Sequence, residues 1–533
     1  MTSTFHGIET AKRSIFTQTA AMNTAGHNVA NANTPGYSRQ TVGMIASRPL
    51  EMPGMNKSVS PGQLGTGVEV SYIKRIRQSF LDEQFWNANR SLGDWEIQAE
   101  TLAKLETIFN EPSDSGLTTV IDNFWKSWSE FSKDPENVTS RKIVRESALA
   151  LVDAFKETSK KITDMQADLT RSLTVNADHI NTLTSQVAQL NYEIYRIEGM
   201  KDNANDLRDQ RDLIIDELSK MGNVTVVEED RGYRVTFGGL ELVNGDVPEV
   251  TTAAALEAAY AGNTLNSGVI FGIIKSKDSI VQDYLEQLNE MANTIANGEV
   301  EIMIPAGSVI PEGTVLNEVT YNGTNRLLTP VTYNGTNRTL TANTTVVING
   351  INGLHKLGYL FTSPAQPAGE FFSGGVGGGK ITAANFSLNK DIEQDANKIA
   401  SSLRVSMTAT GDEVVKGNNT LALLMSQLRD RPFSFGSISS NNGIAQGTVD
   451  DYYRAMMGQL GVQSKEALRQ QDNNQLLVDQ VDSRRQSVSG VSLDEEMANL
   501  MKFQHAYTAA SRFMTTVDQN LDKVINSMGV VGR

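Results

Sequence analysis

The most regular pattern of apolar positions lies close to the C-terminus. Alternating steps of four and three residues from Leu493 give the set Leu493, Met497, Leu500, Gln504, Tyr507, Ser511, Met514, Asp518, Leu521, Ile525 and Met528. Most of these residues are apolar or aromatic, and two such steps make the seven-residue repeat of a coiled-coil seam. The segment 492–495, Ser-Leu-Asp-Glu, fits a capping box. The pattern therefore predicts a long helix that begins at Leu493 and carries one narrow apolar stripe.

A weaker pattern of the same kind lies at the N-terminus. Its apolar positions in three–four register are Phe5, Ile8, Ile15, Met22 and Val29. Thr, Asn and Gly are frequent between them, so the helix propensity is modest and an isolated helix would be marginal in water. Two narrow stripes at opposite ends indicate helices that pair with each other and with neighbouring subunits, as in assembly proteins. A surface helix hairpin of an ordinary globular fold is the alternative that periodicity leaves open.

Helical periodicity also dominates residues from about 75 to 225. Two stripes are clear, namely Ile121, Phe124, Trp125, Trp128 and Phe131, and later Ile180, Leu183, Val187, Leu190, Ile194 and Ile197. Helical patterns return after residue 390. Residues 41–222 and 380–489 are therefore predicted to form a discontinuous helical bundle domain. Residues 1–40 and 490–533 are predicted to form a terminal coiled-coil domain.

Sequence typical of β-strands begins after Gly222. Residues 224–227 and 233–237 are rich in Val, Thr and aromatic residues, and Gly238-Gly239 marks a turn. A helix is expected again near residues 279–297. We predict a β-rich inserted domain from residues 223–298 and 351–379. The fold class is then multidomain α+β, in which terminal coiled-coil helices and a long helical bundle carry β-rich outer domains.

Residues 299–350 form an island with a short internal repeat. The octapeptide Val-Thr-Tyr-Asn-Gly-Thr-Asn-Arg occurs at residues 319–326 and again at residues 331–338. Asn-Gly between β-forming residues is a strong hairpin signal. We expect two tandem hairpins in a small outer insertion. Both copies also contain an Asn-X-Thr glycosylation pattern, but no secretory sequence accompanies it.

Composition narrows the possible classes of partner. The chain has 533 residues, a net charge of −15 and no cysteine, so disulfides, thiolate metal sites and cysteine nucleophiles are excluded. An acidic chain repels nucleic acid and anionic membranes, and the basic groups at residues 74–77 and 484–485 are interpreted as solvated faces. No run approaches the ~18 apolar residues of a membrane span. The first residues also lack the features of a cleaved signal peptide. We expect neither a nucleic-acid nor a membrane partner.

Candidate catalytic and ligand-binding residues are few. Residues 374–380 match the start of a phosphate-binding loop, but Ile381 stands where a magnesium-binding Ser or Thr belongs. The five histidines, His6, His27, His179, His355 and His505, show no metal-ligand spacing. Asp494, Glu495 and Glu496 fit a helix N-terminus better than acid–base catalysis. We predict no cofactor, no metal and no enzymatic activity. A nucleotide-binding enzyme, which depends only on the incomplete loop, is the alternative.

Both ends of the chain carry motifs that resemble a known family. Residues 31–40, Asn-Ala-Asn-Thr-Pro-Gly-Tyr-Ser-Arg-Gln, are similar to the N-terminal signature of bacterial flagellar axial proteins, the rod, hook and hook-associated proteins. Residues 489–500 with 504–507 resemble their C-terminal signature. The motif residues are Asn28, Asn31, Asn33, Thr34, Pro35, Gly36, Tyr37, Ser38, Arg39, Gln40, Ser492, Asp494, Glu495 and Glu496. The continuation Ser38-Arg39-Gln40 is most similar to the hook-associated members. Residues 205–212 also look familiar from them, whereas residues 299–350 are the part that resembles them least.

The resemblance implies a structural part of the flagellum that forms the junction layer between hook and filament. It implies export through the flagellar type III apparatus without a cleaved signal, and an extracellular location. The implied partners are the hook protein, a second junction protein or the flagellin side of the filament, other copies of the chain, and an export chaperone. The expected assembly interface is Phe5, Ile8, Ile15, Met22, Val29, Leu493, Met497, Leu500, Tyr507, Met514, Leu521 and Ile525. Another rod or hook protein, or an adhesin carried by the β island, is the alternative.

Overall fold

The computed structural model describes residues 5–50, 64–109, 116–323, 325–374, 380–408, 411–435 and 445–527. The chain divides into two compact units. Unit 1 contains Met1–Glu96, Leu173–Gly272 and Gln470–Arg533, and unit 2 contains Ile97–Ser172 and Ile273–Arg469. Three long helices, α2 (Ser79–Phe109), α4 (Val138–Glu198) and α12 (Val449–Ser489), contribute residues to both units. This division differs from the four domains expected from the sequence, whose boundaries stay a prediction.

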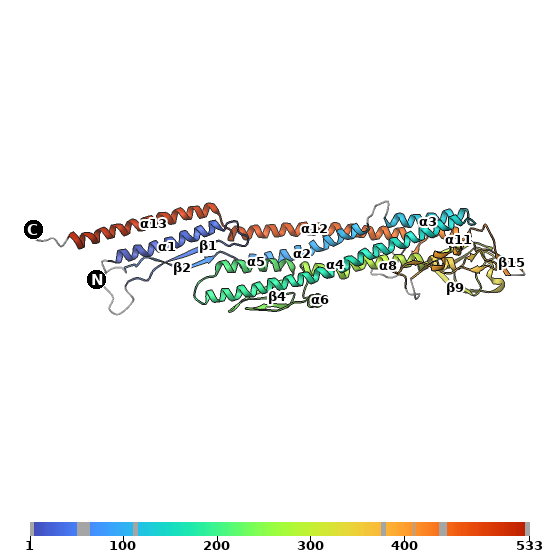
Figure 1. Cartoon of the computed structure of the whole chain (residues 1–533), viewed down its shortest axis with the longest axis horizontal. Coiled ribbons are helices and arrows are strands. Elements are labelled where there is room, and N and C mark those ends of the chain that lie inside the picture. Colours follow the sequence, from blue (N-terminus) through green and yellow to red (C-terminus); the bar gives the residue numbers. More distant parts are fainter. Residues whose placement is uncertain are drawn as a thin grey trace, which may run out of the picture. The chain divides into compact units, whose positions relative to one another are not determined.

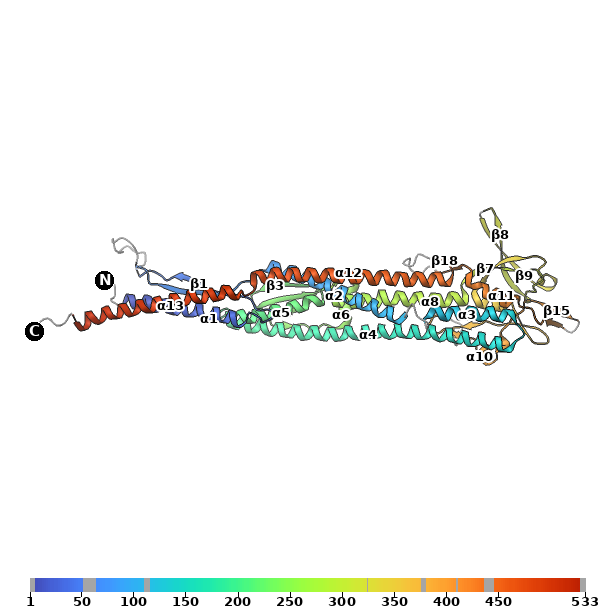
Figure 2. The same cartoon turned by 90° about the horizontal axis from the view of Figure 1, so that it is seen from above.

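In unit 1 the two ends of the chain pack against each other. Helix α1 (His6–Ala30) runs beside α13 (Leu493–Asp522) (Figures 1 and 2). The pair is antiparallel, because Gly7 lies against Val517 near one end and Asn28 is hydrogen-bonded to Glu496 near the other. The predicted start of α13 is confirmed, since the Ser492 hydroxyl accepts a hydrogen bond from the Glu495 N–H at 3.4 Å. Met528 lies outside the described residues.

A two-stranded ribbon follows α1. Strand β1 (Gln40–Ala46) pairs antiparallel with β2 (Val68–Arg75), and both pack on α1. The Thr17 hydroxyl on α1 donates to the Val68 carbonyl of β2 at 3.3 Å. The segment predicted as part of the helical bundle, residues 41–222, therefore also contains strands. The alternation Val-Glu-Val-Ser-Tyr in β2 is a strand signal that is short enough to be overlooked.

The remaining elements of unit 1 include a small sheet in the predicted place. Its strands, in the order β3-β4-β5-β6, are β3 (Val224–Glu229), β4 (Gly232–Phe237), β5 (Leu240–Asn244) and β6 (Val247–Pro248). Gly238 and Gly239 link β4 to β5 with φ values of 55° and 82°, which suits a tight two-residue hairpin. The strands predicted after Gly222 are thus confirmed. The helices are α5 (Asn205–Met221), α6 (Ala253–Ala261) and the start of α7 (Val269–Lys275).

Unit 2 combines helices with a larger sheet. Its own helices are α3 (Leu117–Lys133), α8 (Gln282–Asn297), α9 (Gly350–Lys356), α10 (Lys390–Gln394) and α11 (Thr420–Gln427). Its short strand pairs are β11 (Tyr359–Leu360) with β12 (Gln366–Pro367), β13 (Phe372–Ser373) with β14 (Ser387–Leu388), and β15 (Val405–Thr408) with β16 (Gly411–Val414). None of the helices in the described residues is long and apolar enough to cross a membrane.

The island 299–350 supplies four strands of a six-stranded sheet. The sheet contains β7 (Glu299–Ile304), β8 (Thr314–Asn322), β9 (Asn325–Tyr333), β10 (Thr344–Asn349), β17 (Phe433–Ser434) and β18 (Gln446–Gly447). The first copy of the octapeptide forms the β8–β9 hairpin around Gly323. The second copy ends in a 3-10 helix, Gly335–Arg338. The expectation of two tandem hairpins is therefore wrong for the second copy, because Glu312 and Gly313 hold it in another conformation.

A buried histidine links several elements of unit 2. His355 in α9 is fully buried, its Nδ1 lies 2.7 Å from the Gly369 carbonyl, and its Nε2 accepts from the Ala400 N–H at 3.1 Å. These partners require a neutral ring that donates from Nδ1 and accepts at Nε2. The ring also lies edge-on to Phe371, which packs against Trp128 of the predicted apolar stripe. The histidine is therefore part of the aromatic core.

The environment of His355 predicts an acid sensitivity of unit 2. Burial lowers the pKa of His355 from 6.5 to about 4, so the unfolded chain binds more protons between these pH values. The stabilisation is complete above pH 6.5 and is lost as the pH falls toward 4, by about 3 kcal/mol in all. We expect hydrogen exchange of the Ala400 amide to show this loss. His355→Gln should flatten the dependence, and His505→Gln, at an exposed position, should leave it unchanged.

Candidate functional site

The N-terminal motif reverses the chain after α1. The Tyr37 N–H donates to the Thr34 carbonyl at 3.2 Å, with Pro35 and Gly36 between them and a φ of 78° at Gly36. Proline at the second position and a glycine of positive φ at the third are the requirements of a type II turn. The Asn31 amide also donates back to the His27 carbonyl at 3.1 Å, at the end of α1. The motif thus carries the chain from α1 directly into β1.

Asn28 is the buried centre of this reversal. Its amide nitrogen donates to the Gln40 carbonyl at 2.9 Å and to the Glu496 carboxylate at 3.1 Å. Its amide oxygen accepts from the Tyr37 hydroxyl at 2.8 Å and from the Gln40 N–H at 3.0 Å. These four bonds use both donors and both acceptor positions of the side chain. The motif residues Tyr37 and Gln40 are therefore held by one amide on α1.

The C-terminal motif completes the cluster from the other end of the chain. Glu496, which is 3% exposed, accepts from the Arg39 Nε at 2.7 Å as well as from Asn28. The Arg39 Nη1 donates to Glu495 at 2.8 Å, and the Arg39 backbone N–H donates to the Ser489 carbonyl at 2.8 Å. We call residues 28–40 together with residues 485–496 the elbow. Because Arg39 bridges both carboxylates of one helix, the two terminal motifs form a single site.

A row of aspartates on α5 supports the elbow. Asp206, Asp209, Asp212 and Asp216 are spaced by three, three and four residues, so they share one face of the helix. The Gln40 amide donates to Asp206 at 2.7 Å, and the Ser38 N–H donates to Asp209 at 2.8 Å. This aspartate row therefore binds the start of β1 through side-chain and backbone donors.

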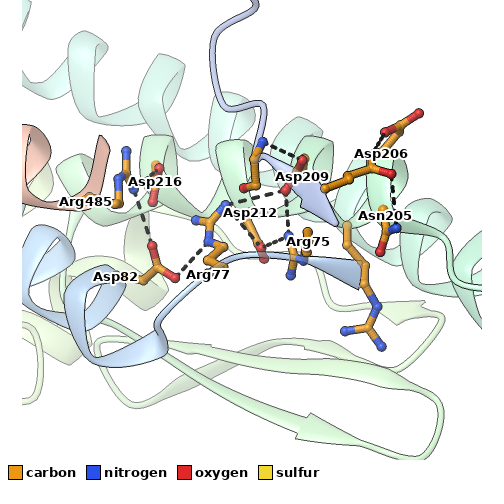
Figure 3. A network of polar contacts seen from close by, with 12 residues as sticks. Arg75, Arg77, Asp82, Asn205, Asp206, Asp209, Asp212, Asp216 and Arg485 are labelled. Atoms are coloured by element: carbon orange, nitrogen blue, oxygen red, sulfur yellow. Dashed lines mark hydrogen bonds and ion pairs between the residues drawn. The ribbon is translucent and has the colours of Figure 1, made fainter. Parts of the chain in front are cut away.

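Arginines from three other segments neutralise the aspartate row (Figure 3). Arg75 Nη1 lies 2.8 Å from Asp209 and 2.6 Å from Asp212. Arg77 lies 2.8 Å from Asp82 and 3.4 Å from Asp212, and Arg485 of α12 lies 2.6 Å from Asp216. These three arginine side chains are only 11–17% exposed. The interpretation of residues 74–77 and 484–485 as solvated faces is therefore wrong for Arg75, Arg77 and Arg485.

Burial and charge act in opposite directions on the aspartates. Burial raises the pKa of Asp209 and of Asp216 above the ordinary value, because the adjacent arginines offset the lost hydration only in part. Burial also raises the pKa of Asp212, but Arg77, Arg75 and Arg211 together outweigh it and hold that pKa below the ordinary value. The site can hold segments together, and within the described residues no group of His, Asp and Glu side chains is arranged to bind a metal ion.

The two motifs are recognisable in the sequence, but the arginines that complete the site are not. The structure brings together Asn28, Tyr37, Ser38, Arg39, Gln40, Ser492, Glu495 and Glu496. Asn33 and Asp494 are exposed instead. The three–four spacing of the aspartates and the alternation of Arg75 with Arg77 were the available signals. Residues 375–379 of the glycine-rich segment lie outside the described residues, and Lys380 lies 3.7 Å from Glu290.

The pairing of α1 with α13 covers the predicted assembly residues only in part. On α1, Ile8, Ile15, Met22 and Val29 are half-buried, whereas Phe5 is exposed. The buried residues of α1 are Ala11, Thr17, Ala21, Thr24, Ala25 and Asn28. On α13, Glu496 and Val517 contact α1, with Phe503 and Ala510 between them at seven-residue intervals. Each of these four residues directly precedes one of the predicted seam positions 497, 504, 511 and 518. Of the predicted set on α13, Leu500, Met514 and Leu521 are half-buried, whereas Leu493, Met497 and Tyr507 remain exposed. Ile525, in the π-helical turn Lys523–Ser527 after α13, is also exposed.

Comparison with known proteins places the chain in a family. The model of the flagellar hook-associated protein FlgK helical domain matches residues 102–302, and that of the flagellar basal body rod FlgEFG protein C-terminal matches residues 483–528. Flagellar hook-associated protein 1 of Bacillus subtilis (strain 168) is 32% identical over 536 residues, with 100% of both chains covered. The chain belongs to the flagellar hook-associated protein 1 family.

Other members of the hook-associated protein 1 family are more distant. Those of Escherichia coli (strain K12) and Salmonella typhimurium are each 25% identical, over 560 and 562 residues, and cover 95% of this chain. A solved structure, the flagellar hook junction protein FlgK from Burkholderia pseudomallei, has a TM-score of 0.48 at 17% identity, covering 76% of this chain and 100% of its own. Membership in the hook-associated protein 1 family therefore depends on the sequence relatives.

The four bonds of Asn28 predict a large effect of its removal. Asn28→Ala removes the bonds to the Gln40 N–H, the Gln40 carbonyl and one oxygen of Glu496, and it leaves the Tyr37 hydroxyl with His27 alone. We expect a loss of about 2–4 kcal/mol in the local stability of unit 1. Hydrogen exchange of the Gln40 amide should show faster opening. Asn23→Ala, at an exposed position of the same helix, is the control, and equal exchange in the two variants would contradict the role of Asn28.

Proposed function

We propose that this chain is the junction subunit between the flagellar hook and filament, incorporated through its terminal helices. The observation that carries the proposal is the likeness to a hook-associated protein 1 over the full length of both chains. A structural role also agrees with the site, because its buried charged side chains form ion pairs that hold distant segments together. On this proposal the chain has no enzymatic activity.

The terminal helix pair is the surface that we propose for assembly. Helix α13 and the π-helical turn that follows it (Lys523–Ser527) keep large apolar side chains on the surface of the isolated chain, with Leu493 50%, Met497 52% and Ile525 66% exposed. Phe16 on α1 is 64% exposed. A neighbouring helix that covers such apolar surface would stabilise the assembly by about 25 cal/mol for each Å² of apolar area removed from water. Lateral copies of the same chain, stacked as a layer, would supply such helices.

The elbow gives this assembly surface a defined direction. Asn28 and Arg39 connect α1 to α13, and the aspartate row connects β1 and β2 to α5. A helix pair that is held by polar bonds at one end transmits force from the neighbouring subunits to α5 and α12. We propose that this connection is what a layer between two different tubular structures requires.

The proposed partners follow from the position in the flagellum. They are the hook protein on one side, a second junction protein or the flagellin side of the filament on the other, and copies of the chain laterally. An export chaperone would keep the terminal stripes covered before assembly. We propose export by the flagellar type III apparatus without a cleaved signal, and an extracellular location at the hook–filament junction.

The first experiment is the deletion of this chain from its own cells. Electron microscopy should show hooks without filaments, and flagellin should be found in the culture medium. Restoring the intact chain should restore filaments. Normal filaments in the deletion strain would overturn the proposed function. They would direct attention to the β island as an adhesin.

Substitutions on α13 test the proposed assembly surface. We expect Met497→Asp to block incorporation, because an ionised carboxylate would have to be buried against a neighbouring helix, at a cost of several kcal/mol. The free chain should remain as stable as before, since Met497 is already exposed. Leu500 is less suitable, because it is half-buried in the free chain.

The matched control is Thr516→Asp, which adds the same charge at an exposed position of α13 outside the stripe. Filament formation would be scored in the deletion strain, and thermal unfolding would be measured on the purified chains. Filaments formed equally well by Met497→Asp and by the control would show that the stripe is not the assembly surface.

A further inference from the structure

One octapeptide of this chain exists in two different environments within unit 2. In the first copy Asn322 is the last residue of β8, where it pairs with Asn325 across the hairpin turn. Gly323 follows it in the turn with a φ of 65°, and both residues are exposed. The β8–β9 hairpin stands out from its neighbours (Figure 2). Among the described residues, none is hydrogen-bonded to the Asn322 side chain or to the Gly323 N–H.

In the second copy the corresponding residues, Asn334 and Gly335, are held by hydrogen bonds. The Gly335 N–H donates to both carboxylate oxygens of Glu312, at 3.1 and 3.3 Å. The Asn334 side-chain oxygen accepts from the Gly313 N–H at 3.0 Å. The Asn334 carbonyl also accepts from the Asn337 N–H at 3.0 Å, which closes the short helix. Sequence is equal in the two copies, so only the surrounding structure distinguishes them.

We propose that Asn322-Gly323 is a self-modification site, at which the asparagine loses its amide spontaneously, whereas Asn334-Gly335 is protected by the fold. The Gly323 backbone nitrogen, after it loses its proton, attacks the Asn322 Cγ. The new C–N bond closes a succinimide ring, and the bond to the side-chain nitrogen breaks and releases ammonia. Water then opens the ring at either carbonyl. The products are aspartate and isoaspartate, so water is the co-reactant and no oxidant is needed.

The two sites differ in the surroundings of both reacting atoms, the glycine nitrogen and the asparagine Cγ. At Asn334 the nucleophilic nitrogen holds its proton in a bond to an ionised carboxylate, and the side chain under attack is anchored to Gly313. At Asn322 the turn glycine allows the nitrogen to approach, because glycine alone has no Cβ to obstruct it. Opening this site needs the loss of only the last pair of a hairpin ladder, where local stability is lowest.

The product would change the tip of the hairpin permanently. A carboxylate at position 322 adds negative charge beside Tyr321, whose hydroxyl donates to Glu301 at 2.8 Å. Arg326 also binds Glu301 and supplies the nearest opposite charge on β9. Isoaspartate lengthens the backbone by one carbon, so it would break the register between Asn322 and Asn325. The fraction of subunits with a converted hairpin tip would therefore increase with the age of the subunits.

The test is peptide mapping by mass spectrometry of the purified full chain during incubation at neutral and mildly alkaline pH. Cleavage at arginine separates the two copies. Fragmentation of each peptide then locates the amide loss, because the peptide that ends at Arg326 also contains Asn244-Gly245 and Asn297-Gly298. We expect Asn322 to convert at least about tenfold faster than Asn334. The reason is that a charge-assisted hydrogen bond must break before the Gly335 nitrogen can attack. Conversion should accelerate with pH at Asn322. In concentrated urea the two sites should react at equal rates.

Variants of Glu312 test whether its hydrogen bond protects Asn334. Glu312→Ala should raise the rate at Asn334 toward that at Asn322. Glu318→Ala is the matched control, because Glu318 binds the Tyr333 hydroxyl of the same copy without touching the Gly335 N–H. Equal rates at both sites in the folded wild-type chain, or faster loss at Asn334, would overturn the proposal. Acceleration by the control as large as that by Glu312→Ala would overturn the role of the Glu312 hydrogen bond.

Discussion

The burial of the aspartate row against arginines is the interaction on which the arrangement of unit 1 depends. An ionised carboxylate that leaves water costs several kcal/mol unless a charge of opposite sign and hydrogen bonds replace the hydration. Asp209 and Asp212 share Arg75, and Asp216 binds Arg485 from a helix near the other end of the chain. Apolar contacts could bury the same surface in several registers, but these charges are satisfied in one. The row therefore determines how β2, α5 and α12 meet.

The elbow extends the same constraint to the two termini. Asn28 uses its whole hydrogen-bonding capacity on partners from β1 and α13, and Arg39 holds two adjacent carboxylates of α13. Small residues such as Ala11, Ala21 and Ala25 make up the buried side of α1. This side allows close approach of α13, while large apolar residues such as Phe16 and Met497 remain exposed. On the proposed function, these exposed residues are the ones that other subunits would cover.

Unit 2 shows how far the surroundings override local sequence. An octapeptide with one hairpin signal forms a hairpin at its first occurrence and a 3-10 helix at its second. The difference arises from Glu312 and Gly313, which bind the second copy and have no equivalent at the exposed tip of the first. His355 gives a related lesson, since its ring nitrogens are used by Gly369 and Ala400 and the side chain belongs to the core.

The elements that depend on local pattern could be predicted from the sequence. The heptad spacing and the capping box located α13, the Gly-Gly turn located the β4–β5 hairpin, and the terminal motifs indicated the family. Which charges are buried, and which face of each helix is covered, depends instead on how distant segments pack together. Arg75 and Arg485 look like ordinary surface residues in sequence, because the residues of the aspartate row that bind them lie more than a hundred residues away along the chain. Periodicity defines an apolar stripe, but the partner that covers it is chosen by packing between distant segments, for which a single sequence carries no local signal.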